Sequence, residues 1–132
     1  MSSISVNKVM LLGRLGADPE LRFTAEGKPI LSFRMATTEV WTDRSGRKQE
    51  RTEWHRVVFW KKTAEQLARI LHRGGRAFVE GTLRNREWHD RDGTKRITTE
   101  VHADYIIALD RKPRQPDPYE GGSYADDDEI PF

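Results

Sequence analysis

The chain has 132 residues, is 36% hydrophobic and 33% charged, contains no cysteine and carries a formal net charge of +2. This length suits one domain with a tail, and no apolar run approaches the roughly 18 residues of a membrane span, so we expect no membrane association. The lack of cysteine excludes disulfides, thiol nucleophiles and thiolate zinc sites, and it is compatible with the cytoplasmic location that we expect.

The first half of the chain shows the alternation of a β protein. A strand is predicted over Val6–Leu15, which is rich in β-branched and apolar residues and ends at a turn over residues 16–19. A short extended piece follows at Leu21–Phe23. The next strand is expected over Ile30–Trp41, where one side of the strand carries Leu31, Phe33 and Met35.

The second half adds one helix and two hairpins. Glu50–Trp60 is predicted as a strand that pairs with the preceding one across a polar loop at residues 42–49. Thr63–Leu71 has one apolar helical face and precedes Gly74 and Gly75, which stop a helix. Two further strands, separated by an Asp-Gly turn, are expected over Arg76–Trp88 and Lys95–Leu109.

Five strands with one helix between the third and fourth match the order of an OB-fold. We therefore predict an all-β, five-stranded Greek-key barrel of the kind whose face and hairpin loops bind oligonucleotides.

After Leu109 the chain becomes rich in proline, glycine and serine and has almost no aliphatic residue, so we expect residues 111–132 to be disordered. Beyond position 112 six acidic residues stand against one basic residue, Arg114, so residues 113–132 carry −5 and residues 1–112 the remaining +7. This split favours a polyanion-binding domain with a separate interaction tail, although a solubilising surface would explain it as well. The expected organisation is a domain over 1–110, a short disordered linker over 111–125 and an acidic tip over 126–132.

Strand parity places tryptophan and arginine on the same sides of two strands. In Glu50–Trp60 the shared side carries Trp54, Arg56 and Trp60, and in Arg76–Trp88 it carries Arg84, Arg86 and Trp88. The other side of each strand supplies an apolar set, with Val79, Gly81 and Leu83 as expected core residues of the second strand. Rings for stacking interleaved with cations for phosphates are what single-stranded nucleic acid requires whatever its sequence.

Two alternatives weigh against that interpretation. A single tryptophan is more often a core or interface residue than a ligand contact, and Trp41 shares parity with Met35 unless a bulge intervenes. Scattered basic residues are usually solvated surface, so the three arginines named above rank ahead of the other candidates, which are Lys8, Arg14, Arg34, Lys48, Lys61, Lys62 and Arg73.

An enzyme is not indicated. The four histidines lie on different predicted elements without ligand spacing, and no phosphate-cradling loop or nucleophile motif is present in the sequence. Residues 126–129 are all acidic, but a disordered tail cannot hold a catalytic magnesium geometry. We expect no catalytic residue, no metal site and no cofactor.

Several motifs resemble those of the bacterial single-stranded DNA-binding proteins. The resemblance covers about residues 4–109 and the last seven, and it is carried by Asn7-Lys8-Val9, Leu15-Gly16, Asp18-Pro19-Glu20, Ala36-Thr37, residues 52–58 (TEWHRVV), Glu80-Gly81 and residues 126–132 (DDDEIPF). It implies a homotetramer that wraps single-stranded DNA around its outside and is associated with the nucleoid. Bases would stack on Trp41, Trp54, Trp60 and Trp88, and His55 would lie at a subunit interface. Trp60 stands where the family often has phenylalanine, and the linker is shorter than in many members.

The tip has its own chemistry. The tip acids can dock onto basic grooves, while the last three residues offer an apolar anchor with a free carboxylate. The resemblance implies that replication, recombination and repair proteins bind this tip, which consists of Asp126, Asp127, Asp128, Glu129, Ile130, Pro131 and Phe132. A solubilising tail would explain the acids but not the apolar end.

Two other functions compete with single-stranded DNA binding for the whole chain. They are an OB-fold adaptor that bridges proteins and an RNA-binding OB protein.

Overall fold

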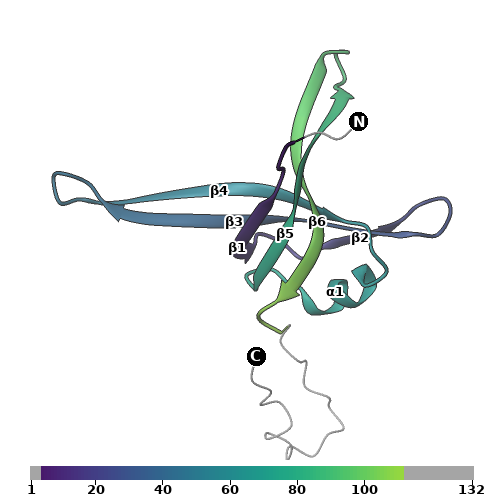
Figure 1. The fold of residues 1–132 in the computed structure, drawn as a ribbon, viewed down its shortest axis with the longest axis horizontal. Helices are drawn as coiled ribbons and strands as arrows, with labels where there is room; N and C mark the ends of the chain where they lie inside the picture. The colour runs from purple at the N-terminus through teal and green to yellow at the C-terminus, as the bar shows by residue number, and fades with distance from the viewer. Residues whose placement is uncertain (1–3, 112–132) are drawn as a thin grey trace, which may run out of the picture.

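The computed structural model describes residues 4–111. Within this range the chain forms six strands and one helix, close to the predicted elements (Figure 1). The extended piece expected at Leu21–Phe23 is a strand in its own right. The elements are β1 (Val9–Leu15), β2 (Glu20–Phe23), β3 (Pro29–Thr42), β4 (Lys48–Phe59), α1 (Ala64–Ile70), β5 (Arg76–His89) and β6 (Lys95–Ala108).

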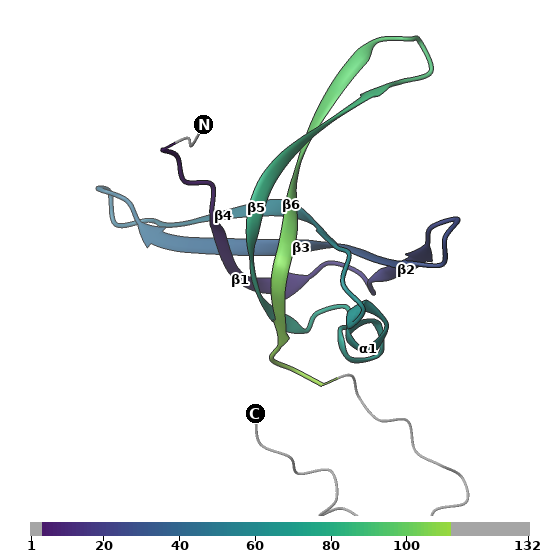
Figure 2. The same ribbon diagram turned by 45° about the vertical axis from the view of Figure 1, so that its right-hand side comes forward.

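Five long strands close into a barrel. The strand order is β1-β5-β6-β4-β3-β2, with an additional pairing between β1 and β3 that closes the sheet on itself. The pairings are antiparallel except that of β4 with β6, which is parallel. The helix α1 comes between the third and fourth long strands and lies at one end of the barrel (Figure 2). The predicted OB-fold is confirmed.

The closing seam depends on a glycine. At the end of β1, Arg14 pairs with Ala36 and Leu15 with Met35, so β1 leaves β5 and meets β3. A Cβ atom on Gly13 would lie 2.1 Å from the carbonyl oxygen of Ala36, which no other residue type could tolerate without moving the strands apart. Gly13 therefore allows the strands to approach closely enough to close the barrel.

The core follows the predicted parity inside the barrel. Leu31, Phe33 and Met35 are buried, as are Val57 and Phe59 on the paired strand β4. Burying side chains of this size stabilises the fold by roughly 1.5–3 kcal/mol each. The other buried members of the cluster are Leu15, Ala64, Leu71, Ala77, Val79, Val101, Ala103 and Ile106.

Two hairpins extend well beyond the barrel, one formed by β3 and β4 and one by β5 and β6 (Figures 1 and 2). The expectation that Leu83 is a core residue is wrong, because this part of β5 lies on a projecting arm where no second layer covers it, and Leu83 is 46% exposed.

The turn at the tip of each of these two hairpins is stabilised by an aspartate. The Asp43 carboxylate accepts hydrogen bonds from the backbone N–H groups of Ser45 and Arg47, and Asp90 accepts the equivalent bonds from Asp92 and Thr94.

The linker and tip predictions cannot be compared with the fold, because residues 112–132 lie outside the described residues. Among residues 4–111, no helix has the length and apolar character needed to cross a membrane.

Candidate nucleic-acid interface

Four charged side chains form a row across the outer face of the barrel. Arg34 on β3 lies directly opposite Arg56 on β4, and Arg84 on β5 lies directly opposite Glu100 on β6. Arg56 joins the two pairs, because its Nε donates a hydrogen bond of 3.0 Å to Oε2 of Glu100. We call these four residues the arginine row. With three guanidinium groups and one carboxylate, the row has an excess of positive charge suited to a polyanion.

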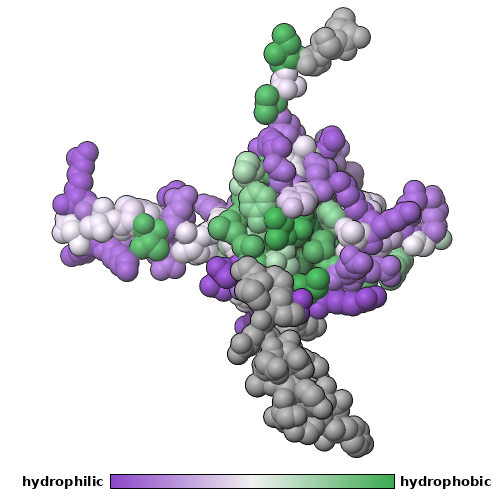
Figure 3. All heavy atoms as spheres, turned by 60° about the horizontal axis from the view of Figure 1, so that its bottom comes forward, coloured by the Kyte–Doolittle hydropathy of each residue, from purple (hydrophilic) through white to green (hydrophobic). Residues whose placement is uncertain are grey.

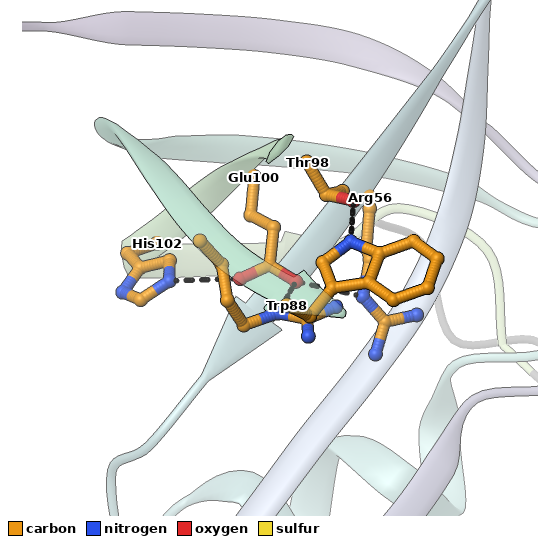
Figure 4. Close-up of polar contacts among 6 residues, drawn as sticks. Arg56, Trp88, Thr98, Glu100 and His102 are labelled. Atoms are coloured by element: carbon orange, nitrogen blue, oxygen red, sulfur yellow. Dashed lines mark hydrogen bonds and ion pairs between the residues drawn. The ribbon is translucent and has the colours of Figure 1, made fainter. Parts of the chain in front are cut away.

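Glu100 is the centre of the polar network on this face (Figure 4). Its carboxylate is 4% exposed and accepts hydrogen bonds from Nε of Arg56 and, at 3.1 Å, from Nε of Arg86. Nε2 of His102 lies 3.3 Å from the other carboxylate oxygen. Burial raises the pKa of Glu100, but the hydrogen bonds from Arg86, His102 and Arg56 together outweigh it and hold the pKa below its ordinary value. The carboxylate is therefore ionised at neutral pH and fixes two arginines on the surface.

Two of the predicted tryptophans lie beside this network. Trp88 on β5 is 39% exposed, and its indole Nε1 donates a hydrogen bond of 2.8 Å to Oγ1 of Thr98, which fixes the ring on the arm (Figure 4). Trp60, directly after β4, is 52% exposed. It borders a surface hollow of about 370 Å³. The residues that line this hollow are Glu20, Arg22, Ile30, Ser32, Arg56, Val58, Trp60, Arg86 and Glu100.

Trp54 lies on β4, two residues before Arg56 on the same side of the strand, and is 50% exposed. The guanidinium carbon of Arg34 lies 4.7 Å from the ring centroid, so a cation covers one face of the indole. The structure thus brings together Arg56, Arg86 and Trp60 around the hollow, with Trp54 and Trp88 on the strands that flank it and Arg84 in the arginine row.

Trp41 lies apart from the other three tryptophans. The pairing of β3 with β4 runs without a bulge from Leu31 to Thr42, so Trp41 keeps the parity of Met35 and not that of Trp54's partner Ala36. It is 42% exposed near the tip of the arm, with the guanidinium of Arg51 5.9 Å from its ring centroid. A stacking role for Trp41 is therefore supported by the family resemblance alone.

His55 points away from the tryptophan side, opposite Met35 in the register of β3 and β4. It is half-buried, and its Nε2 lies 2.8 Å from Oγ1 of Thr37, within hydrogen-bonding distance. Its place at a subunit interface stays a prediction.

A separate apolar patch occupies the outer surface of β1, β5 and β6. Met10 and Leu12 on β1 are 61% and 60% exposed, and the register places them level with exposed side chains of β6 across β5. Hydrophobic atoms also gather in the middle of the barrel surface in Figure 3, while the arm of β3 and β4, at the left, is mainly hydrophilic. We call the following residues the apolar patch: Met10, Leu12, Phe78, Tyr105 and Ile107.

Glu100 is the functional candidate that the sequence analysis missed. A single acid in a strand gives no motif, but its parity is a signal, because Glu100 alternates with the core residues Val101 and Ala103 and so must face outward. In the sequence analysis Arg34 ranks among the scattered surface bases, behind Arg56, Arg84 and Arg86. In the structure it belongs to the arginine row. Among the described residues, no group of histidines and acids could hold a metal ion. The seven predicted tip residues, 126–132, lie outside that range.

Comparisons with known proteins identify relatives of the chain. A model of the single-strand binding protein family matches residues 6–109. Single-stranded DNA-binding protein 1 of Xylella fastidiosa (strain 9a5c) is 46% identical over 109 residues, which are 82% of this chain and 80% of that protein. The single-stranded DNA-binding protein of a serogroup A strain of Neisseria meningitidis is 40% identical over 106 residues, which are 80% of this chain and 61% of that protein, less than two thirds of its length.

Solved structures agree in fold. A Plasmodium falciparum SSB in complex with ssDNA superposes with a TM-score of 0.73 at 35% identity, and the match covers 83% of this chain and all of that one (100%). A deletion mutant of the single-stranded DNA binding protein from Thermus aquaticus gives a TM-score of 0.69 at 37% identity, over 80% of this chain and 51% of that one.

Proposed function

This chain belongs to the single-strand binding protein family, and from that premise we propose that it binds single-stranded DNA without sequence preference across the outer face of its barrel. The observation that supports this most is the combination of the arginine row with the exposed indoles of Trp54, Trp60 and Trp88. The ring of Trp54 lies under Arg34, and that of Trp88 is held by its hydrogen bond to Thr98. Bases stack on the rings and phosphates lie against the guanidinium groups. The protein acts by binding and catalyses no reaction.

Sequence independence follows from the contact types. Each base offers a π-face of similar size and each nucleotide one phosphate, so neither stacking nor charge pairing selects a base. The outer face suits this mode, because it carries the exposed rings of Trp54, Trp60 and Trp88 together with the guanidinium groups of the arginine row. Coating of exposed single strands in this way would protect them during replication, recombination and repair.

We also propose that the chain assembles into a homotetramer through the apolar patch. Exposed apolar surface on a barrel is typical of a protein–protein interface, and the patch lies on β1, β5 and β6, away from the hollow beside Trp60. His55 is placed at an interface by the resemblance alone. In such an assembly several outer faces would be available to one wrapped strand.

Partner recruitment is assigned to the tip, residues 126–132, on its sequence. Its acids suit basic grooves and Phe132 supplies an aromatic anchor. A pull-down with replication, recombination and repair enzymes should recover them with the full chain, but hardly with a chain lacking residues 126–132 or with Phe132→Ala. Equal recovery by all three proteins would leave the tail as a solubility device.

The stacking role is tested by replacing single rings. Trp54→Ala and Trp88→Ala should each weaken poly(dT) binding by about 1–3 kcal/mol, the usual contribution of one stacked base. Phe23→Ala is the matched control, because Phe23 is 54% exposed but has the parity of Leu21, away from the outer face. Unchanged affinity in both tryptophan variants would show that these rings are not the platform.

A further inference from the structure

We propose that Arg34 is a strand-binding residue that changes partners when DNA binds. In the free protein its guanidinium covers the ring of Trp54. In the complex it moves to a phosphate beside Arg56 and leaves the ring to a base. This inference rests on the proposed function, and it adds a DNA contact that neither strand parity nor the resemblance assigned.

Arg34 is held weakly in the free protein. It is exposed on β3, and its guanidinium makes no ion pair with any residue in the range 4–111; the contact that the structure gives it is the ring of Trp54, 4.7 Å away. Arg56, by contrast, is bound to the buried carboxylate of Glu100. Of the two arginines, Arg34 is therefore the one free to move.

The position of Arg34 is electrostatically unfavourable without DNA. Arg34 and Arg56 are directly opposite each other on antiparallel strands, and like charges in that arrangement destabilise a sheet. One carboxylate serves the whole row, and it is already shared by Arg56 and Arg86. A phosphate placed between Arg34 and Arg56 would relieve this repulsion. The face thus has a charge arrangement that an anion completes.

The ring of Trp54 is positioned independently of Arg34. A Cβ atom on Gly16 would lie 2.5 Å from Cζ3 of the indole, so the six-membered ring rests against main chain at a place where no side chain would fit. Gly16 is fixed in turn, because its backbone N–H donates a hydrogen bond of 2.9 Å to the carbonyl of Arg34. The platform therefore stays in place when the guanidinium leaves it.

The relative strengths of the two contacts favour the exchange. An exposed cation–π contact contributes less free energy than a base stacked on an aromatic ring. The departing guanidinium also gains a charge-assisted contact with phosphate, for which arginine is well suited. A base can displace Arg34 from Trp54, and the displaced charge remains on the binding face.

The test is the salt dependence of poly(dT) binding by the full chain. Each phosphate neutralised on a single strand contributes about −0.7 to the slope of log K against log salt. Arg34→Gln should make the slope less steep by about 0.7, while Arg34→Lys, which keeps the charge, should retain it. Arg69→Gln, an exposed arginine on α1, is the matched control and should leave the slope unchanged.

Two results would overturn the inference. One is a wild-type slope in Arg34→Gln, whether the affinity is unchanged or higher, since Arg34 would then only cover the ring. The other is a loss of slope in Arg34→Lys equal to that in Arg34→Gln. Thermal melting should show that Arg34→Gln is at least as stable as the wild type, because a like-charge pair is removed. Failure of the wild-type chain to bind poly(dT) would instead refute the proposed function.

Discussion

At Glu100, burial raises the pKa of the carboxyl group and hydrogen bonding lowers it. Removing a carboxylate from water is costly unless charged donors surround it, and here Arg86, Arg56 and His102 supply them. The group thereby fixes two arginines whose long side chains would otherwise lose more entropy on binding DNA. Its contribution is to order the binding face in advance.

Replacing this carboxylate should destabilise the fold. Glu100→Gln keeps the shape but removes the charge that two guanidinium groups share, and hydrogen bonds to charged groups contribute about 1.5–3 kcal/mol each. We expect the free energy of unfolding to fall by about 1–3 kcal/mol in urea denaturation. Glu87→Gln, which breaks the exposed pair with Lys95, should cost less than about 1 kcal/mol. Equal effects of the two substitutions would contradict the central role of Glu100.

In the strand segments that form the barrel wall, strand parity correctly predicted which side chains face the core and which face outward. Leu31, Phe33 and Met35 were predicted inward and are buried, while Trp54, Arg56 and Trp60 were predicted outward and are exposed. The Glu100 network could not be predicted, because its donors come from three strands and the pairing of β4 with β6 is not local in sequence. The contact of Arg34 with Trp54 lies within the predicted hairpin, but strand parity gives only the side on which a residue lies and not its neighbour on the paired strand.

At the scale of elements, the strands and the helix were predictable because turns punctuate them. Polar turns and an Asp-Gly step bound the hairpins, and the helix bears one apolar face before two glycines. Parity failed on the arms, since a strand pattern does not reveal where the second layer ends. Leu83 is the clearest case. The same reasoning explains Trp41, whose side of β3 is core in the barrel and open to solvent on the arm.

The end of β6 is tied to the start of β5 by one ion pair. The Asp110 carboxylate accepts hydrogen bonds of 2.9 Å from Nε, from a terminal guanidinium nitrogen and from the backbone N–H of Arg76. The side-chain and backbone hydrogen bonds from Arg76 hold the pKa of Asp110 well below its ordinary value. This clamp holds the chain just after β6 against the start of β5.

Acid should weaken that clamp. Because the folded pKa of Asp110 is lower than the unfolded one, its stabilising contribution is present at neutral pH and is lost as the pH falls below about 4. Asp110→Asn should therefore lower stability at pH 7 and lose less stability than the wild type between pH 5 and pH 2. Some acid sensitivity will remain, since Asp43, Asp90 and Glu100 also have lowered pKa values. Asp104→Asn on β6 serves as the control, and a pH profile like that of Asp110→Asn in this control would contradict the account.

At the scale of the whole molecule, the barrel offers two surfaces of different chemistry. The outer face near Trp60 is cationic and aromatic, whereas the apolar patch on β1, β5 and β6 lacks the rings and guanidinium groups that we propose to contact DNA. This separation would allow one chain to bind a strand with one surface and other copies of itself with the second. DNA binding and assembly can then be altered independently by mutation.

The patch is tested by one charge. Leu12→Asp places a carboxylate in the apolar patch, where burial in an interface would be unfavourable. Light scattering should give the mass of a tetramer for the wild type and a smaller mass for Leu12→Asp. Ile97→Asp, on the β5–β6 arm and 61% exposed, should remain a tetramer. The mass of a monomer for the wild-type chain would contradict the proposed tetramer.

The most direct test of the central claim is a tryptophan fluorescence titration of the wild-type chain with poly(dT) at several salt concentrations. Stacking on Trp54, Trp60 and Trp88 should quench the emission strongly, and binding to the arginine row should weaken steadily as salt rises. Equal affinity for poly(dT) and mixed-sequence strands should accompany both effects. Emission that does not change on adding DNA, or an affinity that is flat between low and moderate salt, would contradict the proposal that this face binds single-stranded DNA.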